Sequence, residues 1–252
     1  NIMSTNIIDV DVHTDQEEVA RIVSKYDLLA VPVVDEEKNL LGIITVDDVL
    51  DVVEEEATED IYRLVGTSEV EGADLVDASV YNVARKRIPW LVISLLGGLI
   101  SGSVIGVFEE TLETVVVLAL FIPVIMDMGG NVGAQSSMVF VRGLATGEID
   151  KTDVLQYFLR EVKIGFVMGL VNGVIIALAA TLWQGSPLLG LTVSIAMFTT
   201  IFLAAIIGIV IPLIFYKAGA DPAIASGPFV TTIKDVTGLL IYFVTAKAIM
   251  GI

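Results

Sequence analysis

Five long apolar segments dominate the last two thirds of this 252-residue chain. Each reaches about 20 residues, the length that an α-helix needs to cross the hydrocarbon core of a bilayer. Hydrophobic residues make up 55% of the sequence and the mean hydropathy is +0.82, too apolar for an ordinary soluble protein. The sequence therefore predicts an all-α membrane domain over residues 88–252. Its expected spans are Ile88–Phe108, Leu112–Val141, Ile164–Trp183, Leu191–Tyr216 and Pro228–Met250.

The loops between these spans predict how the chain is oriented. Basic residues precede the first span, lie between the second and third spans, and follow the fourth, whereas the connections at 109–111 and 184–190 have none. Positively charged loops tend to stay in the cytoplasm. We therefore expect the N-terminal end in the cytoplasm and the C-terminus outside, with Lys247 as a minor exception. The basic loop residues are Arg85, Lys86, Arg87, Arg142, Lys151, Arg160, Lys163 and Lys217.

The net charge of −17 is concentrated at one end of the chain. Residues 1–84 hold 21 of the 31 acidic side chains and only 4 of the 14 basic ones, so the remainder is neutral. An acidic module is thus joined to an uncharged membrane domain. The chain has no cysteine, which excludes disulfides and thiolate metal sites.

The acidic module has the residue pattern of a small α/β domain. Thr14–Tyr26 opens with a Thr-x-x-Glu capping box, Thr14 with Glu17, and continues with helical spacing. Two runs rich in branched residues, 29–34 and 40–45, flank a polar turn and predict strands, and a helix is expected from Asp47 to Glu56. With "VPVVD" and "GIITVDD", this order resembles a CBS domain. CBS domains normally occur in pairs, so we expect residues 1–60 to be the second copy and the first to be missing from this sequence.

The resemblance also implies a nucleotide site. In CBS domains the Thr and Asp of a terminal T-x-x-D, here Thr45 and Asp48, often hold the ribose of an adenine nucleotide such as ATP. The alternative is that Thr45 only caps the following helix.

Acidic residues recur three to four positions apart in the same region. Asp47, Asp51 and Glu54 or Glu55 share one helical face, where like charges repel. Mg²⁺ prefers oxygen ligands and binds through carboxylates and retained water. It could bridge this stripe to Asp35, Glu36 and Glu37 on a partner surface. The alternative is a solvated acidic face with no metal.

Residues 61–87 connect the two modules. Within them, Ala73–Arg87 has apolar residues among polar ones and ends in three cations, which is typical of an amphipathic helix arriving at a membrane surface.

Polar residues inside the second span point to a pathway. Pro123–Ser136 reads "PVIMDMGGNVGAQS", with Asp127, Asn131 and Gln135 in an otherwise apolar segment. Ionisable groups at membrane depth usually face a pathway or a partner. The glycines, Gly130 among them, permit a helix break or a close backbone approach. They could alternatively form a packing face for another helix, as we expect for Gly97, Gly98 and Gly102 of the first span.

The last span carries a second polar group. Thr231, Asp235 and Thr237 lie within Val230–Leu240, and the first two are one turn apart on one face. Asp235 is the strongest single candidate for a cation site. An ion pair with Lys234 would be the alternative, but neighbouring residues on a helix point about 100° apart, which predicts poor pairing.

These motifs together resemble the MgtE family of bacterial magnesium channels. The resemblance rests on "GGNVGAQS", "VRGLATGEI", "DPAIASGPFVTTIKDVTGLLIYF" and the CBS element followed by "EEEATEDI". It implies a homodimer in the bacterial plasma membrane, with five spans per subunit and a Mg²⁺-selective pore. It further implies that residues 61–87 form a connecting or plug helix, and that high cytoplasmic Mg²⁺ closes the pore.

Matching positions imply the roles of individual residues. Asp235 corresponds to the pore aspartate that holds hydrated Mg²⁺, and Asn131, Gly130, Asp127 and Thr231 lie in pore-lining segments. Lys234 departs from this pattern, since a small or polar residue is expected beside the pore aspartate. The residues at the family's regulatory Mg²⁺ sites would be Asp35, Glu36, Asp47, Asp51, Glu54 and Glu55.

Two other classes compete with this hypothesis. A proton-coupled divalent-cation transporter would use Asp127 and Asp235 as protonation sites and the CBS element as a nucleotide sensor, but no internal repeat is evident. A membrane enzyme is disfavoured because no nucleophile and base are paired in the membrane half, and the only histidine, His13, lies in the acidic module. We expect no nucleic-acid partner.

Overall fold

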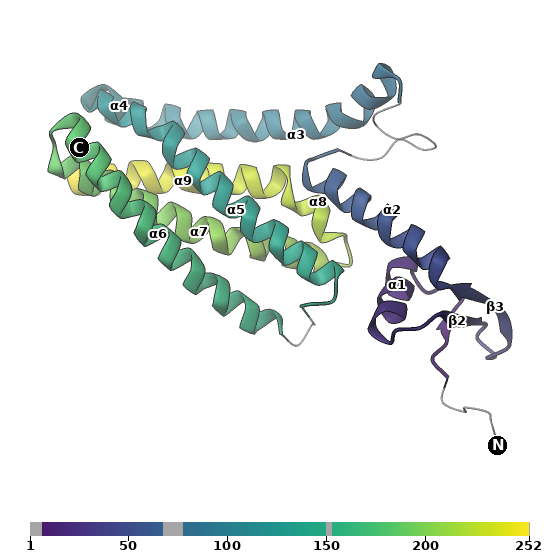
Figure 1. Cartoon of the computed structure of the whole chain (residues 1–252). Helices are drawn as coiled ribbons and strands as arrows, with labels where there is room; N and C mark the ends of the chain where they lie inside the picture. The colour runs from purple at the N-terminus through teal and green to yellow at the C-terminus, as the bar shows by residue number, and fades with distance from the viewer. Residues whose placement is uncertain (1–6, 68–77, 150–152, 252) are drawn as a thin grey trace. The chain divides into compact units, whose positions relative to one another are not determined.

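A computed structural model describes residues 7–67, 78–149 and 153–251. The chain divides into two compact units, Asn1–Ile61 and Tyr62–Ile252. Figure 1 labels most of their helices and strands. The chain is largely helical, with a small α/β region at the N-terminus, as predicted.

The first unit is a three-stranded sheet packed on helices. Its elements are β1 (Val10–Asp11), α1 (Gln16–Lys25), β2 (Ala30–Val34), β3 (Leu40–Thr45) and most of α2 (Val46–Leu64). The strand order is β1-β2-β3, parallel between β1 and β2 and antiparallel between β2 and β3. Val19 and Val23 of α1, Val31 of β2 and Val49 of α2 meet in its core with Val10 and Ala20. The predicted helix, strand, turn, strand, helix order is confirmed.

Two local predictions for this unit need correction. The N-cap of α1 is Asp15, whose carboxylate accepts a hydrogen bond from the Glu17 backbone N–H, and not Thr14. Asp is as good an N-cap as Thr, and the helix begins one residue later. The second helix also extends beyond Glu56 to Leu64, because no glycine or proline interrupts it before Gly66.

Asp35 organises the turn between β2 and β3. Its Oδ1 accepts hydrogen bonds from the backbone N–H groups of Glu37 (3.0 Å) and Asn39 (2.8 Å), and its Oδ2 accepts one from Asn39 Nδ2 (3.0 Å). Lys38 takes the left-handed conformation that this turn requires, with φ 63°. The hydrogen bonds, chiefly those from Asn39, lower the pKa of Asp35 below its ordinary value of 3.8.

The lowered pKa predicts that this hairpin is sensitive to acid. A carboxyl group whose pKa is lower in the folded state stabilises that state above its unfolded pKa, and the contribution disappears as the pH falls through the folded pKa. We expect hydrogen-exchange protection of the β2 and β3 amides in the whole chain to stay level above about pH 5 and to fall below about pH 4. Asp35→Asn should remove most of this dependence. An equal acid sensitivity in Asp35→Asn would contradict the assignment.

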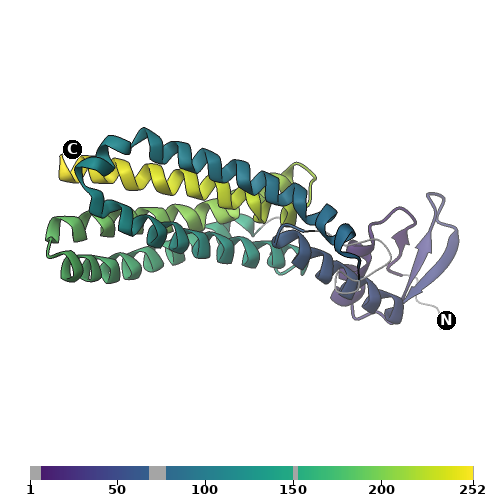
Figure 2. The same ribbon diagram turned by 90° about the horizontal axis from the view of Figure 1, so that it is seen from above.

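The second unit is a bundle of long helices. Five of its described helical segments are long and apolar enough to cross a membrane: Val80–Val107, Val116–Ala145, Val154–Gln184, Pro187–Lys217 and Pro228–Met250. They correspond to α3, to η1 (Val116–Phe121) with α5 (Ile122–Ala145), to α6, to α7 and to α9. Two short helices, α4 (Glu109–Thr114) and α8 (Pro222–Ser226), connect them. The five spans lie lengthwise beside one another (Figure 2).

The helix ends follow ordinary capping rules. Ser186 and Asp221 cap α7 and α8 with their side chains, and proline occupies the first helical position of α7, α8 and α9. Gly185 and Gly251, both in the left-handed conformation, end α6 and α9. Of the residues 73–87 expected to form an amphipathic helix, residues 80–87 are the first turns of α3. Residues 73–77 lie outside the described part of the chain.

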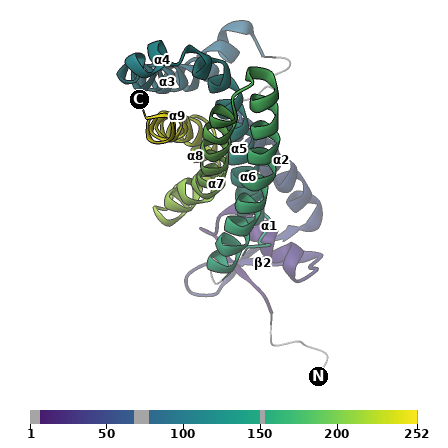
Figure 3. The same ribbon diagram turned by 90° about the vertical axis from the view of Figure 1, so that its left-hand side faces the viewer.

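Small residues bring the helices into close contact. α7 packs against α5, α6, α8 and α9, and Figure 3 shows α9 next to both α3 and α7. Gly165, Gly169 and Gly173 of α6 face residues 194–205 of α7. Gly97 of α3 lies against Thr232 of α9, which confirms its packing role. No described atom of this chain lies within 4 Å of a Cβ position at Gly98 or Gly102.

Candidate cation pathway

The glycine-rich segment of the second span forms a regular helix. α5 runs without interruption from Ile122 to Ala145, so the possible break within Pro123–Ser136 is not found. The irregular backbone lies earlier, at Val115 (φ −131°, ψ 74°), between α4 and η1. The glycines instead serve a close approach to α7. A Cβ placed on Gly129 would lie 3.0 Å from Thr200 Cγ2, and Gly133 presents its carbonyl oxygen to Gly208.

The polar residues of α5 lie on the outside of the protomer. Asp127, Asn131 and Gln135 are spaced four residues apart and are all exposed, whereas Gly129, Val132, Gly133 and Ser136 are buried. Asn131 Nδ2 donates a hydrogen bond to Asp127 Oδ2 at 3.2 Å. An exposed polar stripe thus runs along a helix that is otherwise suited to lipid.

Helix α9 places the second polar group beside α5. The Tyr242 hydroxyl of α9 donates a buried hydrogen bond of 2.7 Å to the Leu118 carbonyl oxygen, which attaches α9 to the start of the second span. Thr231 is exposed, and the Asp235 side chain retains 25% of its accessible surface. The Thr237 hydroxyl donates a hydrogen bond of 2.7 Å to the Ile233 carbonyl oxygen of its own helix.

Lys234 forms the ion pair that its sequence position argued against. Its Nζ lies 2.8 Å from Asp235 Oδ1 and donates a 3.4 Å hydrogen bond to the Met126 carbonyl oxygen of α5. The helical angle between adjacent residues limits short side chains, but the four methylenes of lysine let its ammonium curl back to the neighbouring carboxylate. The expectation of poor pairing is therefore wrong.

Gly130 provides the space for this ammonium. A Cβ at Gly130 would lie 2.6 Å from Lys234 Nζ, so a side chain at this position would require the end of the lysine to shift. The predicted site residues Gly130, Asp235 and Thr231 therefore belong to one α5–α9 region, together with Lys234.

The last turn of α2 contacts the junction from which α9 begins. Arg63 pairs with Asp221, the N-cap of α8. A Cβ at Gly227, between α8 and α9, would lie 3.4 Å from the Leu64 carbonyl oxygen, and one at Gly66 would lie 3.8 Å from Pro228. Sequence reasoning missed this contact because 158 residues separate the two partners, Arg63 and Asp221.

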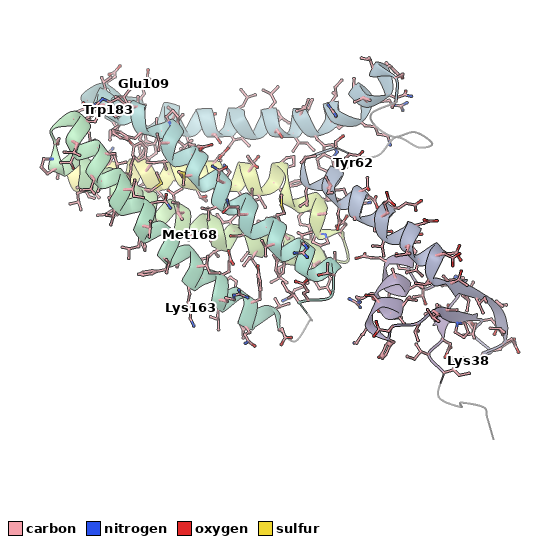
Figure 4. All side chains as sticks on the ribbon, in the orientation of Figure 1. Lys38, Tyr62, Glu109, Lys163, Met168 and Trp183 are labelled. Atoms are coloured by element: carbon pink, nitrogen blue, oxygen red, sulfur yellow. The ribbon has the colours of Figure 1, made fainter. Side chains whose placement is uncertain are left out.

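A buried carboxyl group links α5 to α6. Glu161 is only 8% exposed and accepts a hydrogen bond of 2.6 Å from Ser136 Oγ. Beside it lies a cavity of about 240 Å³, also lined by Tyr157, whose hydroxyl has no hydrogen-bond partner among the described residues. Sequence analysis missed Glu161 because the span was predicted to begin at Ile164, whereas α6 begins at Val154. Figure 4 labels Lys163 and Met168, which follow Glu161 along α6, and Glu109 and Trp183 at the far end of the bundle.

The acidic residues of the first unit do not converge within one chain. Asp47, Asp51, Glu54 and Glu55 lie on α2, and Asp35 and Glu36 lie at the β2–β3 turn. Across the described residues, no three Asp, Glu or His side chains gather closely enough to hold a metal ion. The two residues expected to bind a nucleotide are hydrogen-bonded to each other: the Thr45 hydroxyl donates to Asp48 Oδ2 at 2.9 Å.

The fold defines a multi-pass membrane protein with a CBS domain at its N-terminal end. The CBS family model matches residues 1–55, and the MgtE family model, described as a divalent cation transporter, matches residues 122–245. The chain belongs to the MgtE family, whose members are transporters and not enzymes.

Curated relatives match nearly the whole chain. The magnesium transporter MgtE of Bacillus subtilis is 44% identical over 249 residues, which are 98% of this chain and 54% of the relative. The Thermus thermophilus protein of that name is 42% identical over 251 residues, 99% of this chain and 55% of the relative. That of Enterococcus faecalis is 40% identical over 250 residues, 99% of this chain and 54% of the relative. The chain spans about half the length of these relatives.

Proposed function

We propose that this chain forms the pore and part of the sensor of a Mg²⁺-selective channel that imports magnesium. The pore is enclosed between two copies of the chain by α5 and α9. The single observation that carries this proposal is the exposed polar stripe of α5, on a helix that contacts α9 and its partly exposed Asp235. Polar side chains at membrane depth are costly against lipid. A second copy and a water-filled path between the two would cover them.

The chemistry of this region suits hydrated Mg²⁺. Mg²⁺ dehydrates reluctantly and usually keeps several waters. Asp235 supplies the negative charge, and Asn131, Asp127 and Thr231 supply oxygen atoms that accept hydrogen bonds from those waters. Selectivity then depends on the width of the path and on these outer contacts.

We place the protein in the bacterial plasma membrane with the CBS domain in the cytoplasm and the C-terminus outside. The predominance of basic residues at one set of loops supports this orientation. The names of the relatives, all magnesium transporters of bacteria, support both the ion and the membrane.

Closure by cytoplasmic Mg²⁺ is the second part of the proposal. Mg²⁺ bridges the carboxylates of α2 to acidic groups of another domain or subunit, and its loss lets them repel. The contact of Arg63 with Asp221 supports a route from α2 to the base of α9. ATP at Thr45 and Asp48 would be a further regulator, for which their mutual hydrogen bond must open.

Complementation tests the transport function. The intact protein, expressed in cells that lack their own Mg²⁺ importers, should restore growth in low-Mg²⁺ medium. In proteoliposomes, uptake should persist without a proton gradient. Absence of uptake by protein present in the membrane would contradict the proposal, and a strict need for a proton gradient would favour the coupled transporter.

Neutralising the α2 stripe tests the sensor. The triple variant Asp51→Asn, Glu54→Gln, Glu55→Gln should need more cytoplasmic Mg²⁺ to close. We expect the concentration at which the current is half-inhibited to rise about tenfold, a usual size for coupling between sites. The matched control is Glu109→Gln, Glu110→Gln and Glu113→Gln, which removes equal charge at the α3–η1 connection. Patch-clamp recording measures both. Equal responses in the two triple variants would exclude α2 as the sensor.

A further inference from the structure

We propose that the Lys234 ammonium is a tethered cation that neutralises Asp235 while the pore is empty and moves aside when Mg²⁺ arrives. Lys234 would then set how weakly the site holds its ion, which makes it a specificity-determining residue. The identity of the ion rests on the proposed function. The ion pair itself is a feature of the fold.

The geometry resembles an occupied cation site. Lys234 Nζ is 2.8 Å from the Asp235 carboxylate and 3.4 Å from the Met126 carbonyl oxygen, so oxygen atoms from two helices approach it. Lys234 is only 9% exposed, whereas Thr231 on the same membrane span is exposed. A charge at such depth is stable only when paired.

The surroundings hold the ammonium on the α5 side of Asp235. The absence of a side chain at Gly130 provides its place, since a Cβ there would lie 2.6 Å from Nζ. On the other side Asp235 keeps a quarter of its side-chain surface accessible. An incoming cation therefore has access to the carboxylate while the lysine still holds it.

Charge balance predicts what the lysine does to binding. Without Lys234, two copies of Asp235 would face the pore with two unpaired negative charges, and a divalent ion would bind firmly. With Lys234 the two pairs are neutral, so Mg²⁺ must compete with the ammonium groups. Competition weakens equilibrium binding and speeds release, and conduction requires a site that the ion can leave.

Transport by Lys234→Met in the intact protein tests this inference. Methionine keeps the length and removes the charge. The Mg²⁺ concentration that half-saturates flux should fall by at least about tenfold, which corresponds to about 1.4 kcal/mol of binding free energy. The maximal flux should also fall, because a site that binds the ion more tightly releases it more slowly. General damage to the fold does not tighten binding. Lys234→Arg should keep the wild-type half-saturation, as should Lys247→Met, which removes an exposed lysine from the same helix.

A second variant covers the case in which Lys234→Met does not fold. Gly130→Ala places a methyl group 2.6 Å from the present position of the ammonium, which must then shift, and half-saturation should change in the same direction. An unchanged or raised half-saturating concentration in the folded variants would overturn the inference while leaving transport intact. Absence of flux in the wild type would instead overturn the proposed function.

Discussion

Asp235→Asn is expected to reduce Mg²⁺ flux at least about a hundredfold, because the ion loses a favourable charge interaction of about 3 kcal/mol with the carboxylate. Asparagine has the same shape and still accepts a hydrogen bond. The variant therefore isolates the charge. Flux is measured with a Mg²⁺-sensitive dye enclosed in proteoliposomes, at equal amounts of inserted protein.

The neighbouring lysine complicates this variant in an informative way. Removing the carboxylate leaves Lys234 buried without its ionic partner, and breaking a buried pair is destabilising in itself. The double variant Asp235→Asn with Lys234→Met removes both charges. It should recover thermal stability but not flux. If flux returned with stability, Asp235 would be a structural residue and not the pore carboxylate.

Two other carboxyl groups provide graded controls. Asp127 lies on the exposed stripe and accepts a hydrogen bond from Asn131, so Asp127→Asn should reduce flux less than Asp235→Asn does. Glu113→Gln, in α4 outside the spans, should leave flux unchanged. An equal loss in all three would indicate a general effect of charge on the membrane domain.

The membrane spans were predictable because the bilayer imposes one requirement on the backbone. Every peptide group in lipid needs a partner within its own segment, so an apolar run of sufficient length becomes a helix. The last span illustrates this, since α9 has the predicted bounds Pro228–Met250. The start of α6 was missed by ten residues, from Ile164 to Val154, because its first turns extend outside the predicted apolar run.

The candidate site was only half predictable. Asp127, Asn131 and Asp235 stand out as polar residues in apolar segments, and hydropathy alone identifies them. What each one touches depends on packing between helices distant in sequence. The pairing of Lys234 with Asp235 depends on the space left by Gly130 of another helix. The pairing of Arg63 with Asp221 depends on a tertiary contact between residues that are 158 positions apart in the sequence. Residue spacing contains neither fact.

Gly208→Ala is expected to disrupt the contact between α5 and α7. A Cβ at this position would lie 2.5 Å from the Gly133 carbonyl oxygen, 3.0 Å from Ser136 Cβ and 3.2 Å from the Ser137 backbone nitrogen. These atoms belong to the backbone or to its first side-chain carbon, so no rotamer change relieves the clash. The two helices must separate until the contact reaches the ordinary 3.4–4 Å.

The cost of this separation should be measurable as a loss of stability. Overpacking of this kind costs about 1–3 kcal/mol, which lowers the melting temperature of a domain of this size by roughly 2–4 °C per kcal/mol. Because Asn131 lies on the same helix as Gly133, moving α5 also displaces the polar stripe, so flux should fall with stability.

Gly102→Ala is the matched control for the same chemical change. No described atom lies within 4 Å of a Cβ at Gly102, and alanine favours a helix over glycine by about 1 kcal/mol. Its melting temperature should therefore stay level or rise, while that of Gly208→Ala falls. Thermal unfolding of the two variants in the same detergent decides the matter. Equal shifts in both would mean that α5 and α7 do not meet at Gly133 and Gly208, and the position assigned to the polar stripe would have to be abandoned with that contact.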